Sequence, residues 1–160
     1  MPISPLAGLC LLTAIFYLNF FARIVFAPLL PRMEESLALS HGEAGSFFLF
    51  LSCGYFVALL GSSLLAARVS HQQIIGWSML TISGSLLLIA AGDSLPFLRG
   101  AFFLLGLTSG LYLPSAVATI SALYASHHWG RVFAVHELAP NLAFLSAPLA
   151  TSLMLAYLDW

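Results

Sequence analysis

Residues 6–31 read LAGLCLLTAIFYLNFFARIVFAPLLP, and Arg23 is the only Asp, Glu, Lys or Arg in this stretch. A helix crosses the hydrocarbon core of a bilayer with about 20 mainly apolar residues. The stretch is therefore long enough and apolar enough to span a membrane. Four more stretches with few or no charged residues follow, and we predict membrane spans at 6–31, 44–67, 74–92, 97–124 and 133–158.

The whole chain has the composition of a membrane protein. Of its 160 residues, 61% are hydrophobic and 7% are charged, whereas an ordinary soluble domain carries about 25% charged residues. The formal net charge is −1, and the absence of lysine leaves no basic tract for a nucleic-acid partner. The sequence predicts an all-α fold, a polytopic transmembrane helical bundle in a single membrane domain, with the lipid bilayer as its surroundings.

Helix starts and loop charges indicate how the spans are arranged. Ser40 with Glu43 and Ser70 with Gln73 match the capping-box pattern just before an apolar run. The connections are short, so consecutive helices are expected to be antiparallel neighbours. Arg68 flanks the loop after the second span, and the excess of arginine there and after the fourth span predicts a cytoplasmic N-terminus.

Small residues recur at helical spacing on two of the predicted spans. Gly54 and Ala58 share a face of the second span, and Gly106 and Gly110 form a GxxxG pattern on the fourth span, ahead of Pro114. Such faces let two helix backbones approach closely. They serve either tight packing alone or sliding of helices past one another in a moving bundle.

Arg23 is the main candidate for a functional residue. An arginine within a membrane span is costly unless it faces protein, water or an opposite charge. Asn19 lies four residues earlier on the same helix face, and together the two side chains could form half of a pocket for an anion. The alternatives are that Arg23 extends to the membrane interface or pairs with a carboxylate of another helix.

Glu137 and its neighbour His136 form a second candidate at the start of the fifth span. The carboxylate could take up a coupling proton, pair with an arginine or cap the helix end. No spacing of His, Cys, Asp or Glu fits a metal site, and Cys10 and Cys53 are expected to be buried in the packing. No set of residues could activate a water or a nucleophile, so neither enzyme activity nor a cofactor is expected.

Segments on several spans resemble the N-terminal part of a major facilitator superfamily transporter. In Asn19–Met33, NFFARIVFAPLLPRM, an arginine precedes a proline at the helix exit, as in the opening helix of the family. Leu98–Ala118, LRGAFFLLGLTSGLYLPSAVA, is similar to the fourth-helix pattern of arginine, glycines and proline. His127–Leu149, HHWGRVFAVHELAPNLAFLSAPL, is similar to the loop that ends in Gly-Arg and to the fifth helix.

The loop between the second and third spans matches the family only in part. The family has G-x-x-x-D-R-x-G-R-R/K there, and Arg68 is retained. The other positions carry Ala67 for the acid, Ser70 for the glycine, and His71 and Gln72 for the basic pair. By this resemblance, Arg68 and Arg131 are expected in cytoplasmic gate loops.

The resemblance implies a carrier of twelve helices in two halves, with substrate bound at the midplane and alternating access between the two sides. This chain covers about five of those helices, so the missing C-terminal helices of the carrier are expected partners. The position of Arg23 resembles the first-helix arginine of organophosphate-phosphate antiporters, which implies that the small-molecule substrate is an organic anion.

Two functions are open from the sequence. The first is the N-terminal fragment of a secondary active transporter of a small organic solute in the cell membrane. The alternative is a five-helix membrane protein that does not transport and acts as an assembly or stabilising subunit.

Overall fold

The computed structural model of the chain describes residues 4–157, which form eight α-helices and one short 3-10 helix without any strand. The all-α fold class is confirmed for this part of the chain. In order, the elements are α1 Pro5–Ile24, α2 Phe26–Leu37, α3 His41–Ala66, α4 His71–Ala90, α5 Leu95–Gly110, α6 Tyr112–Leu123, η1 Ser126–His128, α7 Trp129–His136 and α8 Leu138–Leu155.

Successive helices join into five segments that are long and apolar enough to cross a membrane, as a transmembrane bundle requires. These are Pro5–Leu37, His41–Ala66, His71–Ala90, Leu95–Leu123 and Ser126–Leu155. The first segment continues as a helix through Pro31, the predicted end of the first span, to Leu37. The fifth begins before residue 133, and its expected end at 158 lies outside the described residues.

Three of the five segments are interrupted, and each interruption lies at the same distance before a proline. A proline lacks the amide hydrogen that would bond to the carbonyl four residues earlier. At each of these three breaks, the residue four positions before a proline is the last residue of the preceding helix, so the break coincides with a missing backbone bond, whereas α2 and α8 continue through Pro31 and Pro148. The pairs are Ile24 and Pro28, Gly110 and Pro114, and His136 and Pro140.

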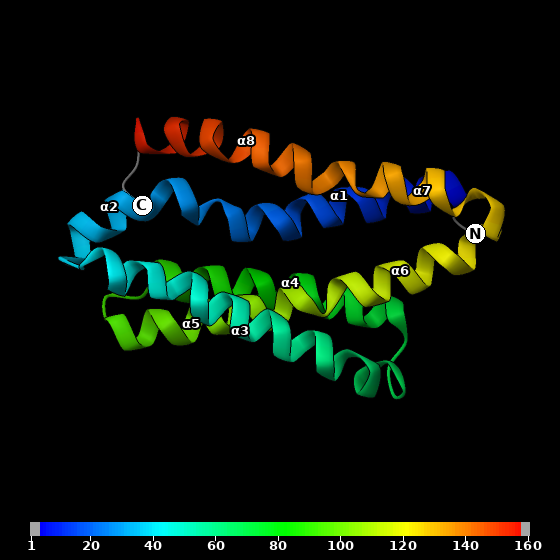
Figure 1. Ribbon diagram of the computed structural model, residues 1–160, viewed down its shortest axis with the longest axis horizontal. Coiled ribbons are helices and arrows are strands. Elements are labelled where there is room, and N and C mark those ends of the chain that lie inside the picture. The colour runs from blue at the N-terminus through cyan, green and yellow to red at the C-terminus, as the bar shows by residue number, and fades with distance from the viewer. Residues whose placement is uncertain (1–3, 158–160) are drawn as a thin grey trace.

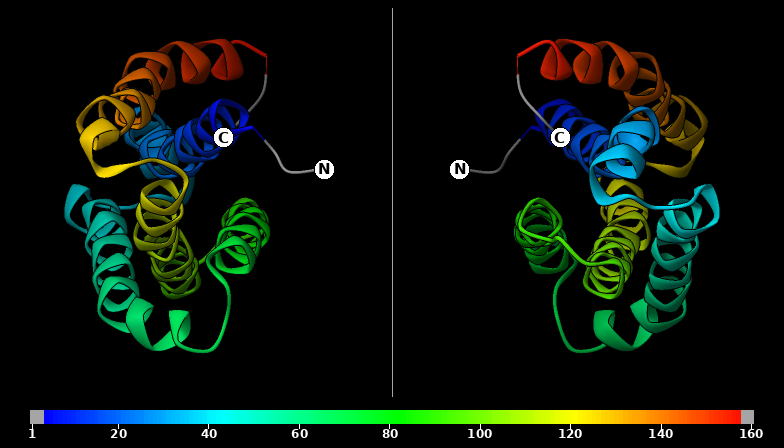
Figure 2. Two further views of the ribbon diagram at one scale, coloured as in Figure 1. Left: turned by 90° about the vertical axis from the view of Figure 1, so that its right-hand side faces the viewer. Right: turned by 90° about the vertical axis from the view of Figure 1, so that its left-hand side faces the viewer.

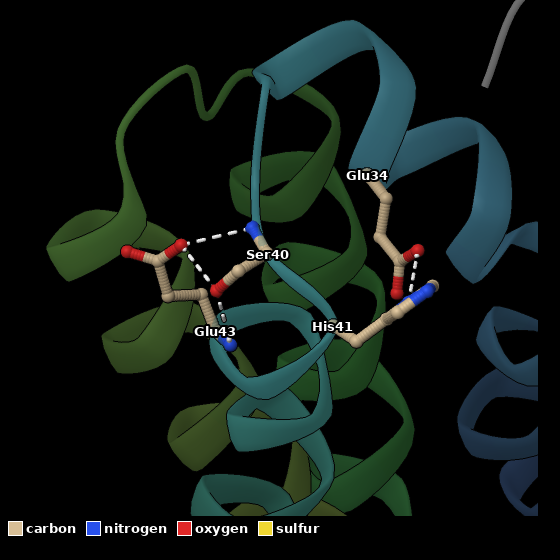
Figure 3. Close-up of polar contacts among 4 residues, drawn as sticks. All are labelled: Glu34, Ser40, His41 and Glu43. Atoms are coloured by element: carbon tan, nitrogen blue, oxygen red, sulfur yellow. Dashed lines mark hydrogen bonds and ion pairs between the residues drawn. The ribbon is translucent and has the colours of Figure 1, made fainter.

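The predicted capping boxes are present at the starts of α3 and α4. At α3, the Ser40 hydroxyl accepts a hydrogen bond from the Glu43 amide at 3.3 Å, and the Glu43 carboxylate accepts one from the Ser40 amide at 2.9 Å. Figure 3 shows this pair beside a second contact, between His41 Nδ1 and Glu34 Oε2 at 2.7 Å. Together these interactions tie the end of α2 to the start of α3.

The helices pack in two groups. Viewed along the bundle, α5 and α6 lie between α3 and α4, and α1 lies between this group and α8 (Figure 2). The start of α1, the α3–α4 turn and the α6–α7 connection lie at one end of the bundle (Figure 1). The core has one cluster around Phe47 and Phe102 and another around Phe16 and Tyr112.

The outer surface is apolar, as the bilayer requires. Large side chains such as Leu64, Leu87 and Leu145 are 75%, 72% and 70% exposed, and in water such a surface would be an aggregation liability. Cys10 and Cys53 are also exposed, free thiols, so the expectation that both are buried was wrong. An apolar stretch of sequence does not show whether a given residue faces the protein core or the lipid, because both faces of a membrane helix are apolar.

Candidate functional site

The contact between α3 and α5 is built on glycine. A Cβ added to Gly54 or Gly106 would overlap the backbone of the facing helix, at Phe103 and Leu51 respectively. A Cβ on Gly110 would lie 2.7 Å from the Cβ of Ala58. These predicted packing residues therefore lie on the two faces that meet, and their small size allows the two backbones to approach closely.

The last turn of α5, just before the break at Pro114, is held by side chains of two other helices. Asn19 on α1 donates its amide to the carbonyl of Ser109 at 3.2 Å, and Ser78 on α4 donates its hydroxyl to the carbonyl of Thr108 at 2.7 Å. All four residues are buried. The Asn19 side chain is thus directed at the α5 backbone, where neighbours supply donors to an interrupted helix.

Arg23 lies partly buried on α1, two residues before the α1–α2 break. Its guanidinium carbon is 4.6 Å from the ring centre of Phe20 and 4.8 Å from that of Tyr55 on α3. Its Nε is buried and has no hydrogen-bond partner. Within residues 4–157, Arg23 forms no ion pair within 4.0 Å of a carboxylate. The guanidinium therefore contacts two aromatic rings, and its buried Nε is an unused donor.

His136 is fully buried at the end of α7. Its ring stacks on Phe16 of α1, with the ring centres 4.5 Å apart, and its Nε2 lies 3.1 Å from the hydroxyl of Tyr112 on α6. Tyr112 in turn donates its hydroxyl hydrogen to the carbonyl of Leu12 at 2.6 Å. A single histidine thus joins α7 to both α1 and α6.

Glu137 follows at the break between α7 and α8, and its side chain is 56% exposed. Its Oε1 lies 3.8 Å from Nδ1 of His136, and its backbone carbonyl accepts a hydrogen bond from Asn141 at 2.9 Å. Glu137 and Arg23 form no direct pair. Instead, Phe16 and Phe20 contact each other at 6.3 Å between ring centres, and so lie between His136 and Arg23.

The two predicted gate-loop arginines lie at the end of the bundle where α1 starts. Arg68 is exposed in the α3–α4 turn, and Arg131 is exposed on α7. Neither forms an ion pair within 4.0 Å in the described part of the chain. Among residues 4–157, no three His, Cys, Asp or Glu side chains are grouped so that they could hold a metal ion.

A family model described as the Major Facilitator Superfamily matches residues 9–160 of the chain. The chain belongs to the major facilitator superfamily. This confirms the resemblance seen in the sequence, and it makes the chain an integral membrane protein of a transporter family, whose members are not enzymes. A comparison with curated proteins finds no match.

Three aromatic side chains of the candidate site, Phe20, Tyr55 and Tyr112, were missed in the sequence. Phe20 lies three residues before Arg23, which puts it on the same helix face. This signal was available but does not stand out in a helix rich in phenylalanine. Tyr55 and Tyr112 come from other segments, and only their packing against α1 identifies them.

Proposed function

We propose that this major facilitator chain forms part of the substrate pathway of a secondary active transporter, and that Arg23 binds a small organic anion as its substrate. The observation that supports this most is the buried Nε of Arg23, which has no hydrogen-bond partner. A cation removed from water without an ion pair is costly. A bound anion would offset that cost.

The geometry around Arg23 favours a carboxylate or a phosphate group. A guanidinium offers several N–H donors in one plane, so it can hold such a group through paired hydrogen bonds. The rings of Phe20 and Tyr55 flank the guanidinium carbon at 4.6 and 4.8 Å. They keep the guanidinium in place by cation–π attraction, and they present apolar surface to the organic part of the substrate.

Transport by alternating access requires helices that can change their relative angles. The three proline breaks supply joints in α1–α2, α5–α6 and α7–α8. The glycine faces of α3 and α5 supply a smooth contact along which helices could move. In this proposal the N-terminus is cytoplasmic, Arg68 and Arg131 belong to the cytoplasmic gate, and the protein functions in the cell membrane.

The remaining helices of the carrier are the proposed partners of this bundle. An apolar groove runs between α1 and α4 and is lined by residues that include Leu18, Phe26, Met79 and Leu86. Its lining has almost no polar surface, so it suits a further transmembrane helix rather than a hydrophilic solute. The substrate is expected on the Arg23 side of α1 instead.

The experiment compares Arg23→Gln with Arg32→Gln in the protein reconstituted in lipid vesicles. Arg32 is the matched control because it is exposed and paired with Glu35 at 3.1 Å. Binding is measured for a panel of phosphate monoesters and carboxylates, with neutral sugars for comparison. Losing charge-assisted hydrogen bonds is expected to weaken anion binding by about one to two orders of magnitude.

The control variant is expected to bind the anions as the parent protein does, and both variants are expected to insert in the membrane. Anion affinity that is unchanged in Arg23→Gln would reject the assignment of Arg23. If the parent protein binds none of the tested anions, the assembly-subunit function is favoured instead.

A further inference from the structure

The hydrogen bonds of Tyr112 determine which nitrogen of His136 carries the hydrogen. A tyrosine hydroxyl has one hydrogen, and here the Leu12 carbonyl, which can only accept, lies 2.6 Å from it. The hydroxyl must therefore accept from His136 Nε2, which lies 3.1 Å away. A neutral imidazole has one N–H, so Nδ1 is left as a bare acceptor.

That bare acceptor is buried and faces a carboxylate. Nδ1 of His136 has no hydrogen-bond partner, and Glu137 Oε1 lies 3.8 Å from it. Two acceptors face each other here, and no donor hydrogen lies between them. One added proton would turn this into a hydrogen bond, either as an imidazolium donating to a carboxylate or as a carboxylic acid donating to the imidazole.

We propose that His136 and Glu137 together form a binding site for one proton at the break between α7 and α8. Without the proton, the pair consists of a neutral imidazole and a carboxylate, and its charge is negative. With the proton, the pair is neutral overall. The exposed carboxylate of Glu137 is the route by which the proton arrives from water, and His136 is the buried partner that holds it.

The surroundings of the site leave this pair to bind the proton by itself. α1 contributes the Phe16 ring and the Leu12 carbonyl, and α6 contributes Tyr112, whose hydroxyl is already committed to that carbonyl. On α7, the nearest basic side chain in sequence is Arg131, which is exposed and makes no ion pair with Glu137 within 4.0 Å in the described residues. On α8, Asn141 bonds to the backbone of Glu137 and leaves the carboxylate free.

The position of the site suggests what the proton does in the carrier. His136 stacks on Phe16, Phe16 contacts Phe20, and Phe20 carries the guanidinium of Arg23, all along one face of α1. A proton that draws Glu137 toward His136 acts on a joint where Pro140 has already removed a backbone bond. This role in transport rests on the proposed function, whereas proton binding by the pair does not.

The test measures the imidazole nitrogens of His136 by 15N NMR, using 15N-histidine-labelled protein in lipid nanodiscs without any substrate. His136→Gln identifies the resonances, and the exposed His127 serves as an internal control in every sample. We expect a hydrogen on Nε2 and a bare Nδ1 at about pH 8, and a protonated or hydrogen-bonded Nδ1 at about pH 5. Glu137→Ala removes the carboxylate and supplies no other hydrogen-bonding group, so Nδ1 is expected to stay bare over this range.

A hydrogen on Nδ1 at the alkaline end, or an unchanged titration in Glu137→Ala, would overturn the proposal. Tyr112→Phe gives a second check, because removing the hydroxyl is expected to abolish the preference for hydrogen on Nε2. A preference that survives in Tyr112→Phe contradicts the hydrogen-bond argument. All these outcomes are read without an anion, so they are independent of whether Arg23 binds one.

Discussion

The glycine contact between α3 and α5 makes Gly106→Ala a strong test of the packing. The new Cβ would lie 2.7 Å from the carbonyl carbon of Leu51 and 3.0 Å from its Cα, whereas carbon atoms normally approach to about 3.5–4.0 Å. The obstructing atoms belong to a helix backbone and cannot rotate away. The two helices must therefore move apart by roughly 1 Å along their contact.

The expected cost follows from two opposing contributions. Overpacking a tight contact costs about 3 kcal/mol at the upper end of the usual range, which applies here because backbone meets backbone. Replacing glycine by alanine within a helix returns about 1 kcal/mol. We therefore expect Gly106→Ala to lower the free energy of unfolding by about 2 kcal/mol.

The assay is reversible unfolding of the protein in lipid–detergent mixtures with increasing SDS, followed by tryptophan fluorescence. Gly100→Ala is the matched control, because it lies on the same helix and an added Cβ there meets nothing within 4 Å. It is expected to be neutral or slightly stabilising. If Gly106→Ala proves as stable as Gly100→Ala, the close backbone contact does not exist in the membrane.

Three further substitutions test the bonds that hold the helix ends. Asn19→Ala and Ser78→Ala each remove a side-chain donor from the end of α5, and each is expected to cost about 0.6 kcal/mol and at most about 1.7 kcal/mol in the same unfolding assay. Ser83→Ala, whose hydroxyl bonds only within α4, is the control, and equal stability of all three variants would contradict the cross-helix role. Ser40→Ala removes the cap of α3 and is expected to cost about 1 kcal/mol, with faster hydrogen exchange in the first turn of α3. Ser94→Ala, where no side-chain cap bond exists, should leave exchange at the start of α5 unchanged, and a similar effect of both changes would rule out the cap.

Local sequence signals predicted the elements of the fold well. The Ser40–Glu43 and Ser70–Gln73 patterns form the expected capping boxes, because a cap depends only on residues three positions apart. Hydropathy located five apolar segments for a related reason, since the length needed to cross a bilayer is set by the bilayer itself. The helix itself runs six residues beyond Pro31, to Leu37, so the end of the apolar stretch does not mark the end of the helix.

Residues of the candidate site could be predicted only where the signal lies within a single helix. Arg23 stood out because a charge in an apolar helix is rare, and Asn19 because it lies one turn away. That Asn19 bonds to Ser109 could not be foreseen, since it depends on how α1 packs against α5. The same holds for His136, whose tautomer is decided by Tyr112 and Leu12 from two other helices.

The proline breaks have a mechanical consequence. Bending a continuous helix stretches or ruptures backbone hydrogen bonds, whereas at Ile24, Gly110 and His136 the bond that bending would strain was never formed. α3 and α4 contain no proline and are unbroken, so they can act as stiff struts while the other three segments flex. The bundle therefore combines two unbroken helices with three segments that can bend, and each bend is located where a proline has already removed a backbone hydrogen bond.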